Sequence, residues 1–169
     1  MSLSIIPHRV FKRFTDVTPQ VLKSMDIHLL LCDLDNTLAP PKTRHPTQEV
    51  RDWIASLTDA GIGFAIVSNN RSGSRVLDYC GELGVPYIGH AGKPKPGGFK
   101  RAMALFHEMP EHTAMLGDLW TTDILGARLW GLTMLAVEPV EGAPNFGHWL
   151  LYQMHRPFMA AARRRQQKK

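Results

Sequence analysis

Short apolar runs alternate with helix-like patterns along most of the chain, and this alternation constrains the fold more than any other feature. The apolar runs occupy residues 28–34, 64–67, 87–90, 113–116 and 133–137. Between the first two runs, Val50, Trp53, Ile54 and Leu57 follow helical spacing after an N-cap candidate, Thr47. Such alternation predicts an α/β fold, a three-layer sandwich with an open, mostly parallel Rossmann-like sheet.

Further helices are expected at five places, one of them short. One begins at Ser72 or Ser74 and ends near residue 83, and two more cover 99–109 and 122–130. The fourth begins at residue 146, and Pro157 should interrupt it. A short helix is expected after Thr18-Pro19, and the tract 163–169 is expected to fray.

The charges are divided unevenly between the ends and the body of the chain. The 169 residues have a formal net charge of +5. Residues 156–169 contain six basic and no acidic residues, and residues 1–25 contain four basic residues and one acidic residue. The body, residues 26–155, contains ten basic and fourteen acidic residues. We therefore expect three parts, a basic N-terminal segment with a short helix, an acidic body and a basic tail.

Cysteine usage and hydropathy indicate the compartment. Cys32 and Cys80 are too few and too far apart for a disulfide framework or a Cys-x-x-Cys metal pair, and Cys32 is expected to be buried. No apolar run approaches the roughly 20 residues that span a bilayer, and residues 1–9 lack the apolar core of a secretory signal. We expect a cytoplasmic protein.

Polar side chains follow four of the expected strands. Asp33 and Asp35 follow the first strand, Ser68 the second, Lys93 the third and Asp118 the fourth. Ligands of open parallel sheets bind beyond the carboxyl ends of the strands, so these side chains should converge. Carboxylates, a hydroxyl and an ammonium suit a phosphate ester together with a divalent cation.

These residues stand in motifs that resemble those of the haloacid dehalogenase (HAD) superfamily of phosphohydrolases. Residues 33–37 (DLDNT) resemble motif I (DxDxT), Ser68 motif II, Lys93-Pro94 motif III, and residues 117–123 motif IV (GDx4D). All four motifs occur in order at the expected strand ends. The resemblance implies a HAD-like phosphatase domain at residues 26–155.

The resemblance also implies the catalytic roles. Asp33 would be the nucleophile that forms an aspartyl-phosphate, and Asp35 would be the general acid and then the general base. Ser68 and Lys93 would bind the phosphoryl oxygens, and Asn69 is taken as a further phosphate-binding residue. An extended backbone would put Asp33 and Asp35 on one face, so a turn after Leu34 is needed to separate their contacts.

By the same resemblance the cofactor would be magnesium (Mg²⁺). Asp33, Asp35 and Asp118 would hold it, the second of these through its backbone carbonyl. Thr37 and Asp123 would have supporting roles, the latter by positioning the motif III lysine or binding the metal through water.

Some of these residues have other interpretations. A calcium loop requires Gly at its sixth position and Glu at its twelfth, where this chain has Leu38 and Arg44. Lys95 competes with Lys93, but the family pattern KPxPxxF begins at Lys93. Asp123 has the alternative of a first-turn helix residue. The eight histidines, none of them at i, i+4 spacing, are interpreted as scattered surface residues and not as zinc ligands.

The spacing of the motifs leaves no room for a cap domain, because 35 residues separate Asp33 from Ser68 and 25 separate Ser68 from Lys93. The chain thus resembles subclass IIIA. Residues 92–99 (GKPKPGGF) and 117–131 (GDLWTTDILGARLWG), with the start at residues 5–11, are similar to a bacterial family related to phosphatidylglycerophosphate (PGP) phosphatases.

Three hypotheses follow. The first is a magnesium-dependent phosphomonoesterase that acts on a PGP-like lipid at the inner face of the membrane, with the basic ends in peripheral contact with anionic lipid. The second keeps this chemistry for a soluble sugar, nucleotide or polynucleotide end phosphate. The third, a nucleic-acid- or ribosome-binding protein, is disfavoured because the body is acidic and no stacking-aromatic motif accompanies the basic residues. No nucleic-acid partner is expected, and the sequence predicts no oligomeric state.

Overall fold

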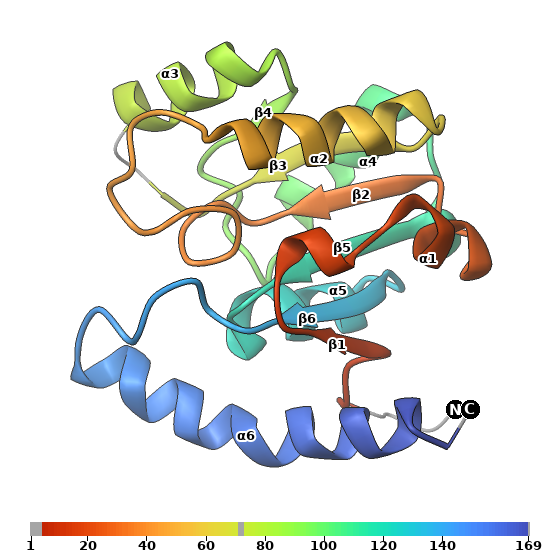
Figure 1. Cartoon of the computed structure of the whole chain (residues 1–169), viewed down its shortest axis with the longest axis vertical. Helices are drawn as coiled ribbons and strands as arrows, with labels where there is room; N and C mark the ends of the chain where they lie inside the picture. Colours follow the sequence, from red (N-terminus) through yellow and green to blue (C-terminus); the bar gives the residue numbers. More distant parts are fainter. Residues whose placement is uncertain (1–4, 71–72, 169) are drawn as a thin grey trace.

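The computed structural model describes residues 5–70 and 73–168, and its centre is a six-stranded sheet (Figure 1). Every strand pairing is parallel, and the strand order is β1-β6-β5-β2-β3-β4. The strands are β1 (Arg9–Phe11), β2 (Leu29–Cys32), β3 (Gly63–Val67), β4 (Tyr87–Ile88), β5 (Thr113–Gly117) and β6 (Thr133–Val137). The predicted α/β sandwich is confirmed.

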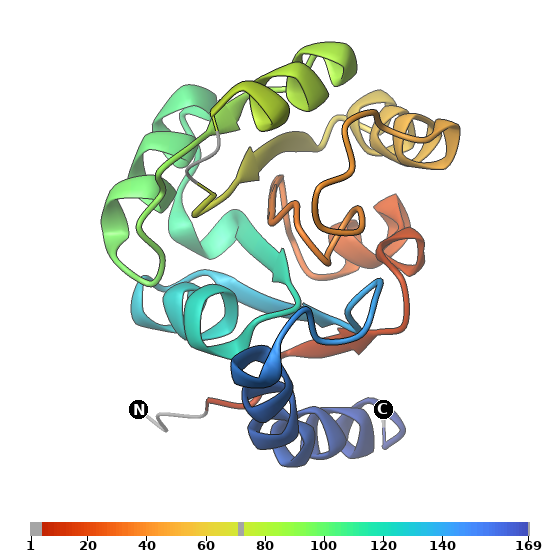
Figure 2. The same ribbon diagram turned by 90° about the vertical axis from the view of Figure 1, so that its left-hand side faces the viewer.

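Helices cover both faces of the sheet (Figure 2). The α-helices are α1 (Pro19–Ser24), α2 (Gln48–Asp59), α3 (Gly73–Leu83), α4 (Pro96–Phe106), α5 (Leu125–Leu129) and α6 (Phe146–Gln166). One core cluster includes side chains from α2, such as Trp53 and Leu57, and the other includes Phe99 from α4 and Ala162 from α6. In the described residues no cap domain is inserted, in agreement with the motif spacing.

The central strand β2 is buried on both faces. Leu30 and Cys32 belong to one core cluster, and Leu29 and Leu31 belong to the other. Burial raises the pKa of the Cys32 thiol well above its ordinary value, which keeps the thiol protonated. The expected burial of Cys32 is confirmed, and β2 provides a rigid support for the residue that follows it.

Several element boundaries differ from the sequence-based expectations. The helix α4 begins three residues before 99 and ends at Phe106, because His107 adopts a left-handed conformation (φ 52°). The helix expected over 122–130 is a π-helical turn, η3 (Trp120–Ile124), followed by α5. Ser74 lies inside α3 and is not its N-cap, while Ser72 lies outside the described residues.

The expected interruption of the last helix at Pro157 and the fraying from residue 163 are both wrong. The helix α6 is continuous through Pro157 to Gln166. It begins at Asn145, whose side chain accepts a hydrogen bond from the His148 backbone N–H at 3.0 Å. Tertiary packing holds its second half, since Ala162 is fully buried on the sheet.

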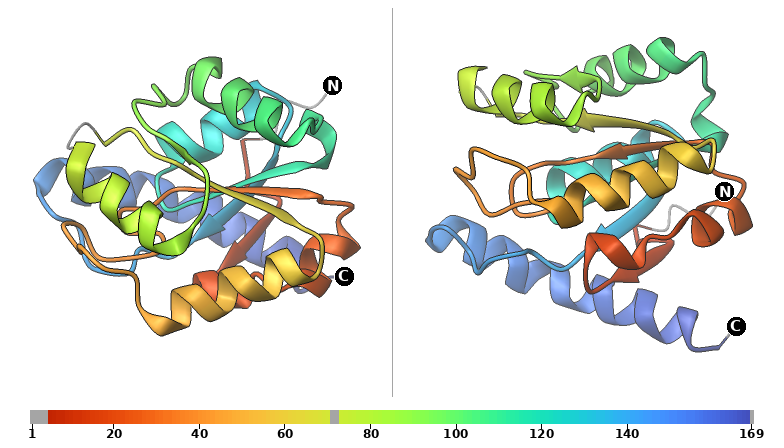
Figure 3. Two further views of the ribbon diagram at one scale, coloured as in Figure 1. Left: turned by 90° about the horizontal axis from the view of Figure 1, so that it is seen from above. Right: turned by 45° about the horizontal axis from the view of Figure 1, so that its top comes forward.

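The sequence analysis missed the edge strand β1. Its three residues, Arg9–Phe11, are too few to show an alternating pattern, yet they pair with residues 135–137 of β6. The Gln166 side chain accepts from the Val10 N–H at 2.9 Å and donates to the Val10 carbonyl at 3.2 Å. The last turn of α6 therefore lies beside the edge strand β1, and α6 runs along this edge of the sheet (Figure 3).

The interpretation of the histidines as scattered surface residues is wrong for His155, and two of the surface histidines, His28 and His112, are paired with each other and not scattered. His28 and His112 stack with ring centroids 4.5 Å apart, and their nitrogens lie 3.3 and 3.1 Å from the Asp26 carboxylate. They precede β2 and β5, at the opposite end of the sheet from the predicted site. His155 is buried.

Over the described ranges 5–70 and 73–168, none of the helices combines the length and the apolar character that crossing a membrane requires.

Candidate active site

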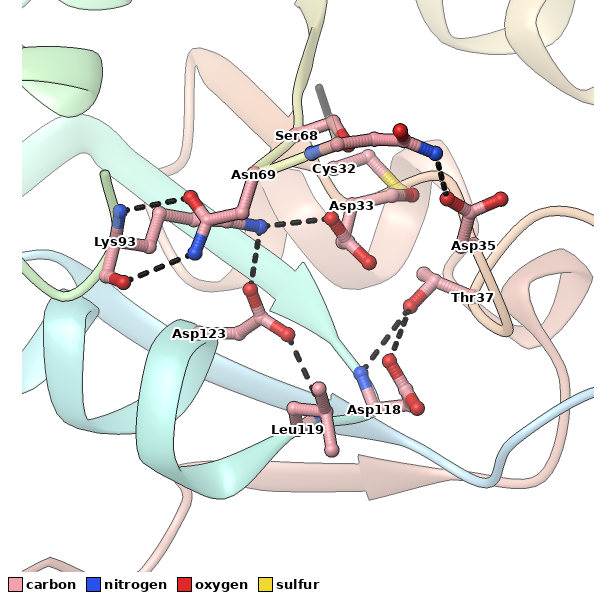
Figure 4. Close-up of polar contacts among 11 residues, drawn as sticks. Cys32, Asp33, Asp35, Thr37, Ser68, Asn69, Lys93, Asp118, Leu119 and Asp123 are labelled. Carbon is pink, nitrogen blue, oxygen red and sulfur yellow. Dashed lines mark hydrogen bonds and ion pairs between the residues drawn. The ribbon is translucent and has the colours of Figure 1, made fainter. Parts of the chain in front are cut away.

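A tight turn follows β2 and sets the positions of the first two aspartates. The Asp33 N–H donates to the Leu116 carbonyl at 2.9 Å, which continues the pairing of β2 with β5. The Leu34 carbonyl then accepts hydrogen bonds from three successive backbone N–H groups, those of residues 37–39. The turn expected after Leu34 is present, and it directs Asp33 and Asp35 to different partners (Figure 4).

Lys93 is held between two buried carboxylates. Its ammonium lies 2.8 Å from Oδ1 of Asp33 and 2.6 Å from Oδ1 of Asp123, and its side chain is only 1% exposed. The other Asp123 oxygen accepts from the Leu119 N–H at 3.2 Å. The neighbouring Lys95 is exposed, so the structure places Lys93 and not Lys95 at the strand ends.

Burial and mutual repulsion perturb the carboxyl groups here. Burial raises the pKa of Asp33 to about 7, although the Lys93 ammonium opposes this shift. Burial and the charge of Asp33 raise the pKa of Asp118 to about 6, and burial also raises that of Asp123. Burial lowers the pKa of Lys93, but the charges of Asp123 and Asp33 outweigh this and raise it above its ordinary value.

These carboxylates fit a divalent metal ion. Oxygens of Asp33, Asp118 and Asp123 lie within 4.8 Å of one another. Both oxygens of Asp123 already bind Lys93 and Leu119, which leaves Asp33 and Asp118 as the better placed donors. Carboxylate oxygens are ligands of hard cations, and such an ion would offset the burial and the mutual repulsion that raise the pKa values of Asp33 and Asp118.

Two further contacts orient Asp118. The Thr37 hydroxyl donates to Asp118 Oδ1 and accepts from the Asp118 N–H, both at 3.2 Å. The Tyr152 hydroxyl donates to Asp118 Oδ2 at 2.6 Å and accepts from Asn36 Nδ2 at 3.1 Å. Tyr152 belongs to α6, so the last helix reaches the site.

Asp35 faces the rim of the site. Its Oδ1 lies 2.6 Å from Nη2 of Arg75, and its Oδ2 accepts from Asn70 Nδ2 at 2.8 Å. Arg75 also donates to the Thr43 carbonyl at 2.8 Å. An arginine of α3 thus connects Asp35 to the loop that follows motif I.

Ser68 and Asn69 follow β3. The Ser68 hydroxyl accepts from the Asn70 N–H at 3.1 Å. The Asn69 side chain accepts from the Lys93 N–H at 2.8 Å and donates to the Lys93 carbonyl at 3.0 Å. Both polar atoms of the Asn69 side chain bind the backbone of Lys93, so Asn69 positions the lysine loop. Its expected contact with phosphate stays a prediction.

The sequence-predicted residues gather around one pocket of about 360 Å³ at the carboxyl ends of the strands. Its lining includes Asp33, Asp35, Ser68, Asn69, Lys93 and Asp118. Thr37 and Asp123 lie behind it and contact the residues that line it. Four further residues contact the site and were not expected from the sequence, namely Asn36, Asn70, Arg75 and Tyr152. Of these, only Asn36 had a signal in the sequence, because it lies inside motif I.

The chain is similar to known phosphatases over most of its length. A family model described as "Mitochondrial PGP phosphatase" matches residues 2–141. The chain is 31% identical over 160 residues to the Bacillus subtilis (strain 168) protein named "Probable phosphatase YqeG", which covers 95% of this chain and 92% of that protein.

Two more distant similarities add to this. The Chlamydomonas reinhardtii protein named "Phosphatidylglycerophosphate phosphatase 1, chloroplastic" is 27% identical over 143 residues, which cover 80% of this chain but only 53% of that protein. The crystal structure of 3-deoxy-D-manno-octulosonate 8-phosphate phosphatase from Yersinia pestis matches with a TM-score of 0.53 and 18% identity, over 84% of this chain and 85% of that chain. This last likeness concerns the fold alone.

Proposed function

Because the chain belongs to the mitochondrial PGP phosphatase family, within the HAD superfamily, it is a phosphatase, and we propose that it hydrolyses phosphate monoesters through an aspartyl-phosphate on Asp33. The observation that carries this proposal is the buried contact of the Lys93 ammonium with Asp33, at the edge of the sheet where Asp35, Ser68 and Asp118 also lie.

In the first half of the proposed reaction, a carboxylate oxygen of Asp33 attacks phosphorus. The bond between phosphorus and the leaving oxygen breaks, and Asp35 gives its proton to that oxygen so that an alcohol departs. Asp35 suits this role because the turn after Leu34 places it at the rim, where the leaving group exits.

In the second half, water attacks the phosphorus of the aspartyl-phosphate. Asp35, now ionised, takes the proton of this water, the acyl phosphate bond breaks, and inorganic phosphate leaves with Asp33 restored. Two displacements at one phosphorus replace a single more difficult one.

Charge compensation is the main task of the other residues. Transfer of a phosphoryl group depends on positioning and on neutralising its oxygens more than on a strong base. We assign this task to the Lys93 ammonium and the Ser68 hydroxyl. Magnesium, held by Asp33, Asp118 and the backbone carbonyl of Asp35, would supply the remaining positive charge.

We propose PGP as the substrate, at the inner face of the cytoplasmic membrane. The description of the family and the name of the Chlamydomonas relative, of whose length the chain spans about half, support this choice. The absence of a cap over the pocket in the described residues agrees with a phosphate presented by a large or surface-bound molecule. The alternative is the same chemistry on a soluble sugar, nucleotide or polynucleotide end phosphate.

The test of the chemistry is phosphate release by wild type, Asp33→Asn and Asp59→Asn, with magnesium or with a chelator. Asp59 is exposed at the end of α2 and serves as a matched control. We expect Asp33→Asn and chelation each to lower kcat/KM at least about 1,000-fold, and Asp59→Asn to change nothing. Unchanged activity of Asp33→Asn would overturn the aspartyl-phosphate mechanism.

The test of the substrate compares kcat/KM for PGP with that for a panel of soluble phosphate esters. A higher value for a soluble ester would overturn the lipid assignment and leave the chemistry intact.

A further inference from the structure

The helix α6 has an inner face at the active site and an outer face in solvent. On the inner face, Tyr152 contacts Asp118 and His155 is buried. The outer face bears four exposed apolar side chains, which we call the outer stripe, namely Phe146 (75% exposed), Trp149 (48%), Leu150 (48%) and Met154 (59%). They stand at positions i, i+3, i+4 and i+8 of the helix, which puts them on one side of it.

The outer stripe begins with an exposed aromatic pair. Phe146 and Trp149 stack with centroids 5.6 Å apart and an angle of 21° between their planes. Contiguous exposed apolar side chains are typical of an interaction surface, and aromatic rings such as that of Trp favour the boundary between lipid headgroups and acyl chains.

The second half of α6 is basic. The helix contains four arginines and no acidic residue, and Lys168 follows it. Arg163 pairs with Glu138, whereas Arg156 and Arg164 are exposed. An apolar first half and a basic second half complement an anionic bilayer, in which acyl chains lie under negatively charged headgroups.

A groove connects this helix with the active site. It has a volume of about 830 Å³ and lies between α6 and residues 136–142. Its lining includes Trp120, Val140 and Met159, and it shares Asp118 and Tyr152 with the phosphate pocket. A lipid whose phosphate enters the pocket would find apolar surface immediately beside it.

We propose that α6 lies in the plane of an anionic bilayer. The outer stripe inserts at the headgroup boundary, Arg156 and Arg164 contact anionic headgroups, and the groove receives the apolar part of a lipid phosphate. With 21 residues, α6 is about 30 Å long and provides an extended contact. This inference deepens the proposed lipid substrate and rests on it.

The test measures binding to vesicles of phosphatidylglycerol and of phosphatidylcholine by co-sedimentation. The test variant combines Phe146→Ser with Trp149→Ser. The matched control is Leu77→Ser on α3, since Leu77 is 59% exposed and lies away from α6. We expect wild type and control to bind phosphatidylglycerol vesicles, and the double variant to bind at least tenfold more weakly. Hydrolysis of soluble p-nitrophenyl phosphate should be the same in all three proteins.

A second double variant tests the basic half of α6, and its result does not depend on that of the Phe146 and Trp149 variant. Arg156→Gln with Arg164→Gln should weaken binding to phosphatidylglycerol vesicles severalfold and reduce its dependence on salt. Binding to phosphatidylcholine should be weak in every protein.

Three outcomes would overturn the proposal. These are a wild type that does not bind phosphatidylglycerol vesicles, a double variant that binds as well as wild type, and a wild-type dimer that the double variant dissociates without any vesicle binding. In the last case the outer stripe would be a contact between two copies. Because p-nitrophenyl phosphate hydrolysis needs no vesicle, failure of the proposed chemistry would appear separately, in the comparison with Asp33→Asn.

Discussion

Lys93 places a positive charge within a group of closely spaced carboxylates. Its ammonium is buried against Asp33 and Asp123, and it is held from behind by the contacts of Asn69 with its backbone. Two carboxylates that bind one ammonium also fix its position, so in the proposed reaction this charge would meet an incoming phosphate without reorganisation.

Replacing this ammonium should harm both stability and activity. Lys93→Met leaves two buried carboxylates without their cation, which should cost about 3–5 kcal/mol of unfolding free energy and lower kcat/KM at least about 100-fold. Urea unfolding and p-nitrophenyl phosphate kinetics measure the two effects. Lys95→Met, at the exposed neighbour, is the control, and similar behaviour of both variants would contradict this role of Lys93.

Burial of His155 should lower the free energy of unfolding in acid. This residue is buried in α6, and among the described residues its Nε2 has no hydrogen-bond partner, so burial lowers its pKa to about 4. In the unfolded chain it takes a proton near pH 6.5. The folded state resists this proton, so stability that is present above pH 6.5 is lost as the pH falls to about 4.

The loss of unfolding free energy due to His155 should reach at most about 3 kcal/mol. Urea unfolding of wild type and His155→Gln at pH 7.5 and pH 4.5 measures it, and the variant should lose less between the two values. Equal losses in both proteins would show that His155 does not titrate in this way.

At the scale of elements, the end of β5 and the turn η3 meet at a point that admits no side chain. A Cβ added at Gly117 would overlap the Asp123 carboxylate. That close approach lets Asp123 reach both Lys93 and the Leu119 N–H. The glycine of motif IV therefore acts on the position of Lys93 through packing.

Gly117→Ala should displace Asp123, with a cost of about 1–3 kcal/mol in stability and a lower kcat. Gly81→Ala on α3 is the control, since a Cβ there meets nothing within 4 Å, and it should stabilise the helix by about 0.5–1 kcal/mol. Thermal unfolding and kinetics compare the two. An active, stable Gly117→Ala protein would show that the backbone can yield at this point.

The elements that the sequence predicted well are those with a strong local pattern. The strand β2 is continuously apolar, and α2 has both a periodic face and its N-cap at Thr47, whose hydroxyl accepts from the Val50 N–H. Where tertiary packing outweighs local preference, the predictions failed, as at Pro157 within α6 and in the three-residue strand β1.

The same distinction holds for the site. Residues that follow strands could be located from the sequence, because parallel strands bring their carboxyl ends to one edge of the sheet. Tyr152 and Arg75 lie on helices and reach the site only through the packing of α6 and α3. No spacing relative to the motifs could reveal them.

At the scale of the whole molecule, the basic ends belong to the packed structure. Arg13 pairs with Glu49 of α2 at 2.6 Å, and Arg163 pairs with Glu138 after β6. Part of the basic charge of the two ends therefore pairs with the acidic body, while Arg156 and Arg164 of α6 are exposed.

A truncated chain should accordingly lose stability as well as charge. Deleting residues 156–169 removes the buried Ala162 and the contacts of Gln166 with β1, at a cost of at least about 2 kcal/mol. Activity on soluble substrates should fall because the fold is weakened, and activity on lipid substrates should fall further because Arg156 and Arg164 are also removed. Thermal unfolding measures the change, and an unaltered midpoint would contradict this prediction.

Gln166 and Val10 are in contact although they are 156 positions apart in the chain. This separation has a consequence for the order in which the strands can pair while the protein is being synthesised. The strands β2 and β3 are neighbours in the sheet and follow each other closely in the chain, so they can pair early. The strand β1 leaves the ribosome first but must wait for β6 before it gains a partner, and for the end of α6 before it is fastened. The nascent chain can thus complete its sheet only after β6 has been made, and Tyr152 and the side chain that fastens β1 are added when α6 follows.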